Sequence, residues 1–285
     1  FSIRDVPQFE WRGIMLDVSR HFFTMAEVKR MIDTMSLFKL NRLHLHLTDG
    51  PGWRLEIKKY PLLTAMSAWR VPLASGEWNW QEVKLAIQEN DPEATYGGFY
   101  TQEQMKEIIA YARSRRVTVV PEIELPGHAY AAMHAYGELV CDGVNFPVEG
   151  KKGRDTVCMG RPETLRFVKD VVDELKTIFP PGSPIHLGHD EVSTESWRNC
   201  KYCQSRLKEL NENSLKALGR DFLQQVASYV RQGGYDAIVW DEGGELEADK
   251  HIFVMAWRGN DVAAGAARKG HSVILSPSSH FYFDY

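Results

Sequence analysis

The stretch Pro184–Val192, with the sequence PIHLGHDEV, decides the fold of this 285-residue chain. An apolar run that begins at a proline predicts a short buried strand, and this one ends on two histidines and two adjacent carboxylates. Neighbouring residues of an extended backbone point to opposite sides, so Asp190 and Glu191 are expected to have different roles unless the chain turns sharply there. An Asp-Glu pair is also typical of an exposed loop before a helix, so the remaining sequence has to decide between the two interpretations.

Strands and helices alternate along the whole chain. Besides the strand at 184–192, strands are predicted over residues 11–19, 42–49, 117–125, 237–241, 252–257 and 272–276. Helices are predicted over residues 25–38, 101–115, 162–179 and 261–269, and two more over 203–232 with a break near 211–214. Thr24 and Thr101 stand where a side-chain oxygen can cap the helix that follows. This alternation predicts a parallel sheet that is buried on both faces.

Polar and aromatic side chains fall at the carboxyl ends of these strands, namely Asp49, His128, Asp190, Glu191, Trp240 and Trp257. In an α/β barrel those ends converge on one mouth, where active sites lie, whereas an open sheet would spread them along an edge. The chain length also suits one barrel of about 250 residues. We therefore expect an α/β fold, a TIM-type (β/α)8 barrel without its eighth strand, rather than a doubly wound sheet. The chain is expected to be a single catalytic barrel domain over residues 1–285, incomplete at its C-terminus.

Charge and composition argue against several classes of partner. The net charge is −4 with both signs mixed along the chain, so no basic face for nucleic acid or for an anionic membrane is expected. No apolar run reaches the ~20 residues that a membrane span needs. The chain has 8 Trp and 11 Tyr, which is many for this length. Most are expected to pack in the core, but flat aromatic faces also suit sugar binding.

The chain has four cysteines, Cys141, Cys158, Cys200 and Cys203. The last two form a CxxC motif, while the first two lie far from it and from each other in the sequence. Two disulfides in loops are the first expectation, with free thiols and a metal site as alternatives. Disulfides would indicate an exported protein, because they persist in oxidising compartments.

His44 and His46 form an H-x-H pair on one face of the predicted second strand, a spacing that metal-dependent barrel hydrolases use for ligands. Such a hydrolase is one alternative, with His128, His186 and Asp284 as further ligands. The other explanation of the pair is packing and hydrogen bonding inside the barrel. Our first expectation is that the chain has no metal site. The sequence contains no G-x-S-x-G nucleophile elbow and no phosphate-binding loop.

A carboxylic acid among aromatic residues suits the cleavage of glycosides, because an apolar site raises the pKa of the acid and keeps it protonated near neutral pH. Two carboxylates usually flank the bond at about 5–5.5 Å or 6.5–9.5 Å from each other. Immediate neighbours in sequence suit a different plan, in which the amide oxygen of a 2-acetamido sugar is the nucleophile. The enzyme then needs one acid and one carboxylate that orients the amide, roles that Glu191 and Asp190 can fill.

Four motifs resemble those of glycoside hydrolase family 20, the β-N-acetylhexosaminidases. They are RGIMLDVSRH at residues 12–21, HLHLTD at 44–49 followed by WR at 53–54, PEIELPGH at 121–128, and HLGHDE at 186–191. The resemblance extends over essentially the whole chain. Each motif alone would be weak, but together they are highly specific.

The resemblance implies that Glu191 is the general acid/base and that Asp190 orients the acetamide group and stabilises an oxazolinium intermediate. It implies a carbohydrate substrate and no cofactor. The family usually has glycine where this chain has His189. We therefore expect His189 to crowd the site or to alter the proton affinity of Glu191.

The resemblance also implies residues that bind the substrate. Arg12 would bind outer sugar hydroxyls, and Trp240 and Trp257 would wall the acetamide pocket. Tyr282 would donate a hydrogen bond to the acetamide oxygen, and Asp284 would bind a sugar hydroxyl. Two further polar residues would support the site, Asp49 and His128.

The function that these residues imply is that of an exo-acting, retaining β-N-acetylhexosaminidase, which removes terminal GlcNAc or GalNAc from glycans, glycoconjugates or chitin fragments. The family's barrel continues to an eighth strand with a Trp and a Glu that line the sugar pocket, whereas this chain stops at Tyr285. A non-catalytic module that binds amino sugars is therefore the alternative from another class. The family and the cysteines both suggest export, to the periplasm, the cell exterior or a lysosome.

Overall fold

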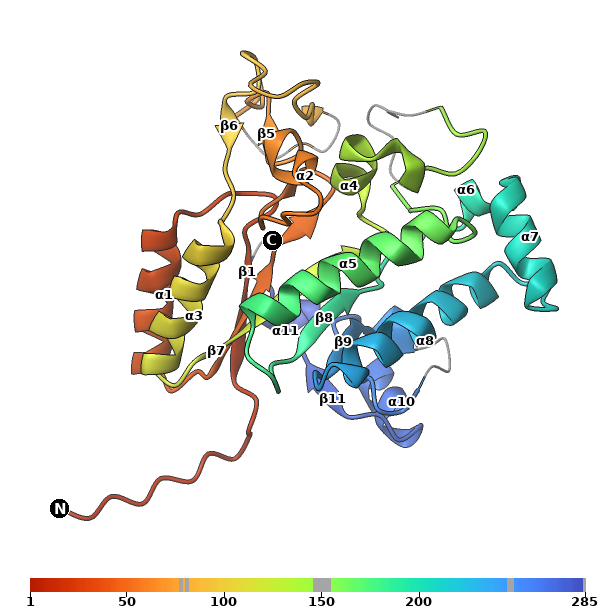
Figure 1. Ribbon diagram of the computed structural model, residues 1–285. Helices are drawn as coiled ribbons and strands as arrows, with labels where there is room; N and C mark the ends of the chain where they lie inside the picture. The colour runs from red at the N-terminus through yellow and green to blue at the C-terminus, as the bar shows by residue number, and fades with distance from the viewer. Residues whose placement is uncertain (77–78, 80–81, 146–154, 245–248, 284–285) are drawn as a thin grey trace.

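A seven-stranded parallel sheet forms the centre of the molecule (Figure 1), whose computed structural model describes residues 1–76, 79, 82–145, 155–244 and 249–283. Its strands are neighbours in chain order: β1 (Gly13–Asp17), β2 (Arg42–His46), β7 (Thr118–Leu125), β8 (Ile185–Gly188), β9 (Ala237–Trp240), β10 (Phe253–Ala256) and β11 (Val273–Leu275). Every neighbouring pair is parallel. All seven predicted strands are present, and the sheet is curled like a barrel that is open between β1 and β11. The predicted α/β fold is confirmed.

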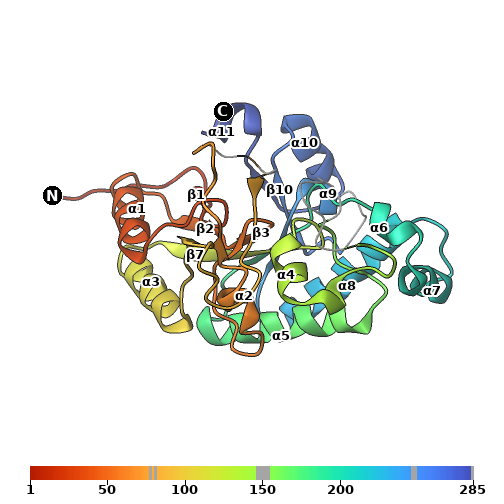
Figure 2. The same ribbon diagram turned by 90° about the horizontal axis from the view of Figure 1, so that it is seen from above.

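Helices lie around the outside of the strands (Figure 2). The five that follow strands in the expected alternation are α1 (Met25–Leu37), α3 (Gln102–Ser114), α5 (Pro162–Ile178), α8 (Lys216–Gln232) and α10 (Asn260–Arg268). Both predicted caps form, since the Thr24 and Thr101 hydroxyl oxygens accept from the backbone N–H groups of Glu27 and Gln104, and each is part of a capping box. The predicted break before α8 also exists, because six residues separate α8 from the end of α7 (Lys201–Glu209).

Short elements fill the connections. They are β3 (Thr48–Asp49), β4 (Gly52–Trp53), α2 (Leu62–Ala65), β5 (Trp69–Arg70), β6 (Tyr96–Gly97), α4 (Tyr130–Ala135), the 3₁₀ helix η2 (Gly137–Leu139), α6 (Glu195–Arg198), α9 (Asp241–Gly244) and α11 (Ser278–Phe281). Among the described residues no helix is long and apolar enough to cross a membrane.

Arg54 organises the long connection between β2 and α3. Its side chain is fully buried, and its guanidinium donates to the backbone carbonyls of Val18, Ser19, Ala68 and Gly98. These carbonyls belong to segments that are far apart in the sequence. A planar guanidinium with five donors can satisfy them all at once, so one side chain fixes the connection against the carboxyl end of β1.

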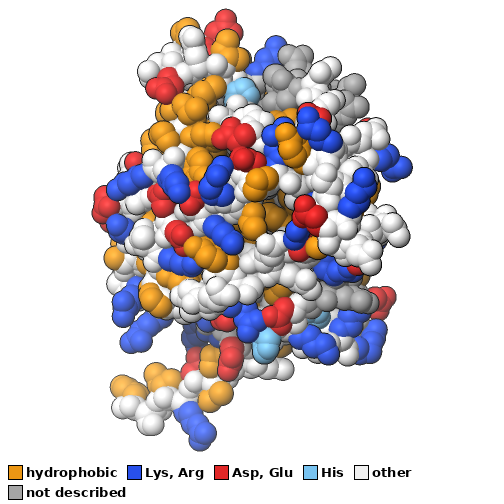
Figure 3. All heavy atoms as spheres, turned by 45° about the vertical axis from the view of Figure 1, so that its right-hand side comes forward, with side chains coloured by type: hydrophobic (Ala, Val, Ile, Leu, Met, Phe, Trp, Pro, Cys, Tyr) orange, Lys and Arg blue, Asp and Glu red, His pale blue; other side chains and the backbone are white. Residues whose placement is uncertain are grey.

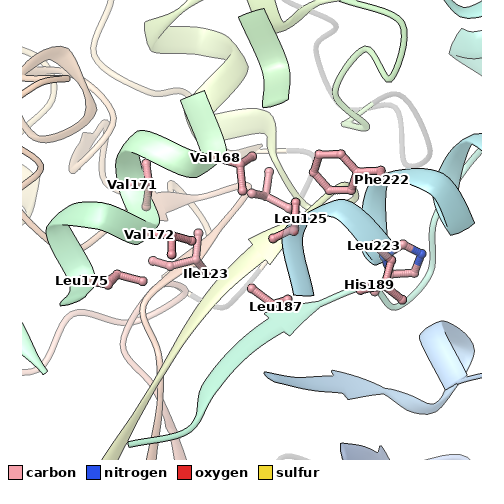
Figure 4. Close-up of a pocket in the computed structure, with 11 residues that line it drawn as sticks. Ile123, Leu125, Val168, Val171, Val172, Leu175, Leu187, His189, Phe222 and Leu223 are labelled. Atoms are coloured by element: carbon pink, nitrogen blue, oxygen red, sulfur yellow. The ribbon is translucent and has the colours of Figure 1, made fainter. Parts of the chain in front are cut away.

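The two faces of the sheet differ in chemistry. Along β7, Ile123 and Leu125 face outwards, where they line an apolar space together with Leu187 of β8 (Figure 4). The helical side of this space is lined by Val168, Val171, Val172 and Leu175 of α5 and by Phe222, Leu223 and Val226 of α8. The alternate residues Glu122 and Glu124 are buried and face inwards. The outer face is therefore the hydrophobic core, and the inner face carries the ionisable groups.

Charged side chains of both signs are mixed over the molecular face drawn in Figure 3. This distribution matches the small net charge of −4. Among the described side chains on this face, no large patch carries a single sign of charge.

Candidate active site

Asp190 and Glu191 follow β8 in a sharp turn. The backbone φ angle is +68° at Gly188, +76° at His189 and +46° at Glu191. The positive φ at Gly188 favours glycine, and a Cβ there would lie 2.0 Å from Oε1 of Glu124. Because the chain is not extended here, the two carboxylates do not point to opposite sides, as an extended backbone would require.

His128 lies between these carboxylates. Its Nε2 is 3.6 Å from Oδ2 of Asp190 and 3.6 Å from Oε2 of Glu191. Its Nδ1 is 3.6 Å from Oδ1 of Asp49 and 3.9 Å from Oδ2 of Asp155. Burial alone would lower the pKa of His128, but the negative charges, that of Asp49 above all, raise it well above its usual value. The ring is therefore a cation at neutral pH that joins the carboxylates of three loops.

Asp49 is the second connecting residue. Its Oδ2 is 2.7 Å from the guanidinium of Arg20 and 3.1 Å from Nε2 of His46. Burial alone would raise the pKa of Asp49, but the charges of Arg20 and His128 hold it well below its usual range. Arg20 also pairs with Asp17 at 2.6 Å. One partly exposed arginine is thus fixed at the mouth of the barrel by two carboxylates.

Glu122 is the centre of a buried group inside the barrel. His44 Nε2 lies 2.9 Å from its carboxylate, His186 Nδ1 lies 3.1 Å from it, and His46 Nδ1 is also hydrogen-bonded to it. The Trp240 indole donates to the same carboxylate at 2.7 Å. Burial alone would raise the pKa of Glu122, but the three histidines hold it well below its usual range.

The histidines around Glu122 differ in their pKa values. Burial alone would lower the pKa of His46, but the charges of Glu122 and Asp17 and the hydrogen bonds to Asp49 and Glu122 together raise it well above its usual value. Burial lowers the pKa of His186 to about 4 despite the same neighbour. His46 is therefore the cationic partner of Glu122 and continues the chain of charges to Asp49 at the mouth.

Glu124 is a neutral acid beside Asp190. Burial, and then the negative charges of Asp190 and Glu122, raise its pKa well above its usual value. Burial also raises the pKa of Asp190, an effect that His128 opposes. Glu124 and Asp190 are side-chain hydrogen-bond partners, with the neutral Glu124 carboxyl as the donor. The Asp190 side chain remains 21% exposed, so its carboxylate can also accept from the amide N–H of a ligand.

The aromatic candidates lie at the ends of β9 and β10. Trp240 is buried and contacts the rings of His44 and His186. Trp257 is partly exposed, stacks on Tyr282 at a centroid distance of 6.4 Å, and donates to Oε2 of Glu242 at 3.0 Å. The structure thus brings Trp257 and Tyr282 together, whereas Trp240 belongs to the inner group.

Glu242 is a residue that sequence analysis missed. Burial and the adjacent Asp241 raise its pKa to about 7. It follows β9 directly and holds the Trp257 indole. Glu242 stands two residues after the apolar run AIVW at 237–240, so the sequence places it near the carboxyl end of a strand, where site residues are expected.

Arg12 requires a correction. Its guanidinium donates to the carbonyl oxygens of Phe9 and Lys39, before the start of β1 and at the opposite end of the barrel from the mouth. The structure therefore does not bring Arg12 to the site, and the arginine that it places there is Arg20. The rule that active sites lie at strand carboxyl ends would have chosen Arg20, because that residue follows β1 and Arg12 precedes it. Asp284 lies outside the described residues.

His189 does not face the carboxylates. Its side chain lies in the apolar space between the sheet and the helices, close to Leu223 and Phe222 of α8 (Figure 4). Burial lowers its pKa to about 4, so the ring is neutral at neutral pH. Its backbone N–H donates to Oε1 of Glu124 at 3.0 Å. The geometry therefore does not support direct crowding of a sugar by His189.

The four cysteines are not paired as two disulfides, which corrects that expectation. All four are buried and free, and their sulfur atoms form one cluster. The separations are 3.8 Å for Cys141–Cys203, 3.6 Å for Cys158–Cys200 and 3.7 Å for Cys158–Cys203. The prediction of export then depends on the family resemblance alone.

The expected metal alternative involved His44, His46, His128, His186 and Asp284. His44, His186 and Glu122 present ligand atoms within 4.8 Å of one another and could hold an ion. His128 lies instead with the carboxylates at the mouth. His44 and His186 therefore lie in the inner group around Glu122, and His46 connects this group through Asp49 to the mouth.

An α/β barrel with two adjacent carboxylates, a cationic histidine and aromatic rings at its strand ends has the architecture of a barrel glycoside hydrolase. The chain belongs to glycosyl hydrolase family 20, because the model of that family's catalytic domain matches residues 9–285.

Relatives support this assignment. A beta-hexosaminidase of Porphyromonas gingivalis is 40% identical over 291 residues, covering 100% of this chain and 34% of that protein. One of Vibrio furnissii is 36% identical over 288 residues, covering 99% of this chain and 45% of that protein. The chain thus spans between a third and a half of the length of these relatives.

Solved structures agree with the fold. The exo beta-N-acetylglucosaminidase of Vibrio harveyi in complex with N-acetylglucosamine has a TM-score of 0.84 and 32% identity, over 96% of this chain and 42% of that chain. A mutant beta-hexosaminidase of Streptomyces plicatus in complex with the product GlcNAc has a TM-score of 0.77 and 35% identity, over 98% of this chain and 50% of that chain.

Proposed function

We propose that this chain is the catalytic barrel of an exo-acting β-N-acetylhexosaminidase that removes terminal GlcNAc or GalNAc with retention of configuration. The observation that carries the proposal is the position of His128, 3.6 Å from both Asp190 and Glu191. In most glycosidases two carboxylates from different segments lie on either side of the scissile bond. Two neighbouring carboxylates on one side of a barrel mouth cannot take up that arrangement. They suit a reaction in which the 2-acetamido group of the substrate supplies the nucleophile.

Exposure separates the roles of the two carboxylates. The Glu191 side chain is 40% exposed and the Asp190 side chain is 21% exposed. Glu191, nearer to solvent, protonates the departing oxygen and then takes a proton from the incoming water. Asp190, the deeper of the two, accepts from the acetamide N–H and stabilises the oxazolinium cation.

The surrounding residues position these groups. The charge of His128 lowers the pKa of Asp190 and so favours the carboxylate that a cationic intermediate requires. Arg20 offers its guanidinium to sugar hydroxyls in place of Arg12, while Trp257 and Tyr282 form an aromatic wall. Since the chain spans only part of its relatives, the activity is tested on this chain itself.

The test compares Glu191→Gln and Asp190→Asn with the unsubstituted chain on aryl N-acetyl-β-glucosaminides. Loss of the acid should lower kcat/KM by about 10²–10⁴-fold for a poor leaving group, and far less for dinitrophenol, which departs without a proton. Loss of Asp190 should lower kcat/KM for both substrates and weaken binding of a sugar-fused thiazoline that mimics the bicyclic intermediate. Glu195→Gln, at an exposed carboxylate on α6, is the control.

If Glu191→Gln lowers kcat/KM equally for the poor leaving group and for dinitrophenol, the acid role of Glu191 is contradicted. A folded chain that binds the thiazoline without turning over either substrate would instead support the non-catalytic amino-sugar-binding module.

A further inference from the structure

We propose that the chain binds one structural Zn²⁺ through four thiolates, those of Cys141, Cys158, Cys200 and Cys203. The four sulfur atoms all lie within 4.8 Å of one another, and three of the pairs are 3.6–3.8 Å apart. Zinc–sulfur bonds of about 2.3 Å in a tetrahedron give sulfur–sulfur edges of about 3.8 Å. The cluster therefore has the dimensions of a closed zinc site with four cysteine ligands.

The distances favour a metal over disulfides. Cys158 lies almost equally far from Cys200 and Cys203, at 3.6 and 3.7 Å, so the cluster shows no preference for one pair. All four side chains are buried, in a small apolar cluster that also contains Trp197. A site closed to solvent, with four protein ligands, has the form of a structural zinc site rather than a catalytic one.

The backbone around the sulfur atoms suits thiolates. Cys200 precedes the first residue of α7 and Cys203 lies in its first turn, where helix N–H groups favour negative charge. The Gly160 backbone N–H donates to the sulfur of Cys158. A Cβ on Gly160 would lie 2.0 Å from the carbonyl carbon of Tyr202, so only glycine allows the two cysteine-bearing segments to approach this closely.

Positive charges stand beside the cluster. Arg161 lies over the Tyr202 ring at 4.2 Å and Lys201 lies over it at 5.1 Å, and Tyr202 is one of the two residues between Cys200 and Cys203. Zinc with four thiolates carries a net charge of −2, and nearby cations stabilise such a charge.

The ligands come from the two segments that carry the catalytic groups. Cys141 and Cys158 belong to the connection from β7 to α5, in which the Ala129 N–H donates to Asp155 at 2.8 Å, next to His128. Cys200 and Cys203 follow Asp190 and Glu191. The metal would therefore fasten the segment that holds His128 to the segment that holds the two carboxylates.

The test measures the metal content and thiol count of the protein purified without chelator. We expect one zinc per chain, and visible absorption typical of tetrahedral cobalt thiolate after exchange with Co²⁺. Cys203→Ser should reduce the zinc content to less than a tenth, whereas Cys203→His should retain it because imidazole is also a zinc ligand. His44→Gln, which alters the separate barrel group, should leave the zinc content unchanged.

Thiol titration after unfolding without reductant gives the outcomes that would overturn the proposal. Four reactive thiols and no zinc would identify free cysteines, and no reactive thiols would identify disulfides. Zinc that persists in Cys203→Ser would place the metal elsewhere. If Cys203→Ser does not fold, loss of zinc from a folded Cys203→His would equally contradict the tetrahedral site.

Discussion

At the scale of residues, the mouth of the barrel depends on one shared cation. His128 lies within 4 Å of four carboxylates, those of Asp49, Asp155, Asp190 and Glu191. The charge of the ring acts to lower the pKa of Asp49, Asp155 and Asp190, and Asp49, Asp190 and Glu191 in turn raise the pKa of the ring. Chemistry at Asp190 is therefore coupled to residues on two other connections, those that follow β2 and β7.

Replacement of His128 by glutamine should shift the pH dependence of catalysis. His128 lowers the pKa of Asp190, so the loss of its charge raises that pKa. Asp190 acts as a carboxylate, so the acidic limb of the kcat/KM profile should move to higher pH by about one unit or more. His134→Gln on α4, away from these carboxylates, should leave the limb in place. If the acidic limb of the kcat/KM profile of His128→Gln is unchanged or moves to lower pH, this coupling is refuted.

The sequence predicted most of this group because strand ends could be located, and Asp49, His128, Asp190 and Glu191 all stand there. It failed where the backbone departs from regular geometry. The left-handed φ of +76° at His189 turns the chain, and a histidine at that position gives no signal for such a turn. The prediction of Arg12 is wrong because Arg12 precedes β1, whereas Arg20 follows it and reaches the mouth.

At the scale of elements, hydrophobic periodicity and helix caps sufficed for the seven strands and the main helices. The connection between β2 and α3 was not predictable, because the contacts that fix it join distant segments. Arg54 reaches Ser19 and Gly98 through the interior, and nothing local in the sequence reveals these partners. The cysteine cluster illustrates the same limit, since spacing alone could not bring Cys141 to Cys203.

Arg54→Lys should destabilise the chain strongly although the positive charge is retained. Lysine has three donors on a single nitrogen and cannot reach carbonyls on three segments, so several buried acceptors lose their partners. Burial lowers the pKa of Arg54 only to about 10, so the native group is charged at neutral pH. We expect a loss of about 3 kcal/mol or more in the free energy of unfolding, measured by urea denaturation.

The matched control is Arg113→Lys, at an exposed position in the last turn of α3, which should change the free energy of unfolding by less than about 0.5 kcal/mol. KM should also rise in Arg54→Lys, since Ser19, one of its acceptors, adjoins Arg20. Equal stabilities of the two variants would mean that Arg54 does not organise the connection.

At the scale of the whole molecule, the open side of the barrel is its least protected feature. Within the described residues β1 and β11 each have one neighbouring strand in the main sheet. Large apolar side chains are exposed on and after β11: Leu275 is 56% exposed, Phe281 59% and Phe283 89%. Unpaired strand edges with apolar side chains favour association with other chains.

An eighth strand between β11 and β1 would pair both edges and cover these side chains. We therefore expect a version of the chain extended by such a strand to unfold at a higher temperature and to remain monomeric in light scattering. The 285-residue chain should associate as its concentration rises. Leu275→Lys should reduce this association, because a lysine on an edge strand opposes pairing with another edge. If the 285-residue chain is monomeric at high concentration and as heat-stable as the extended version, the gap between β1 and β11 is not a liability and seven strands form a self-sufficient barrel.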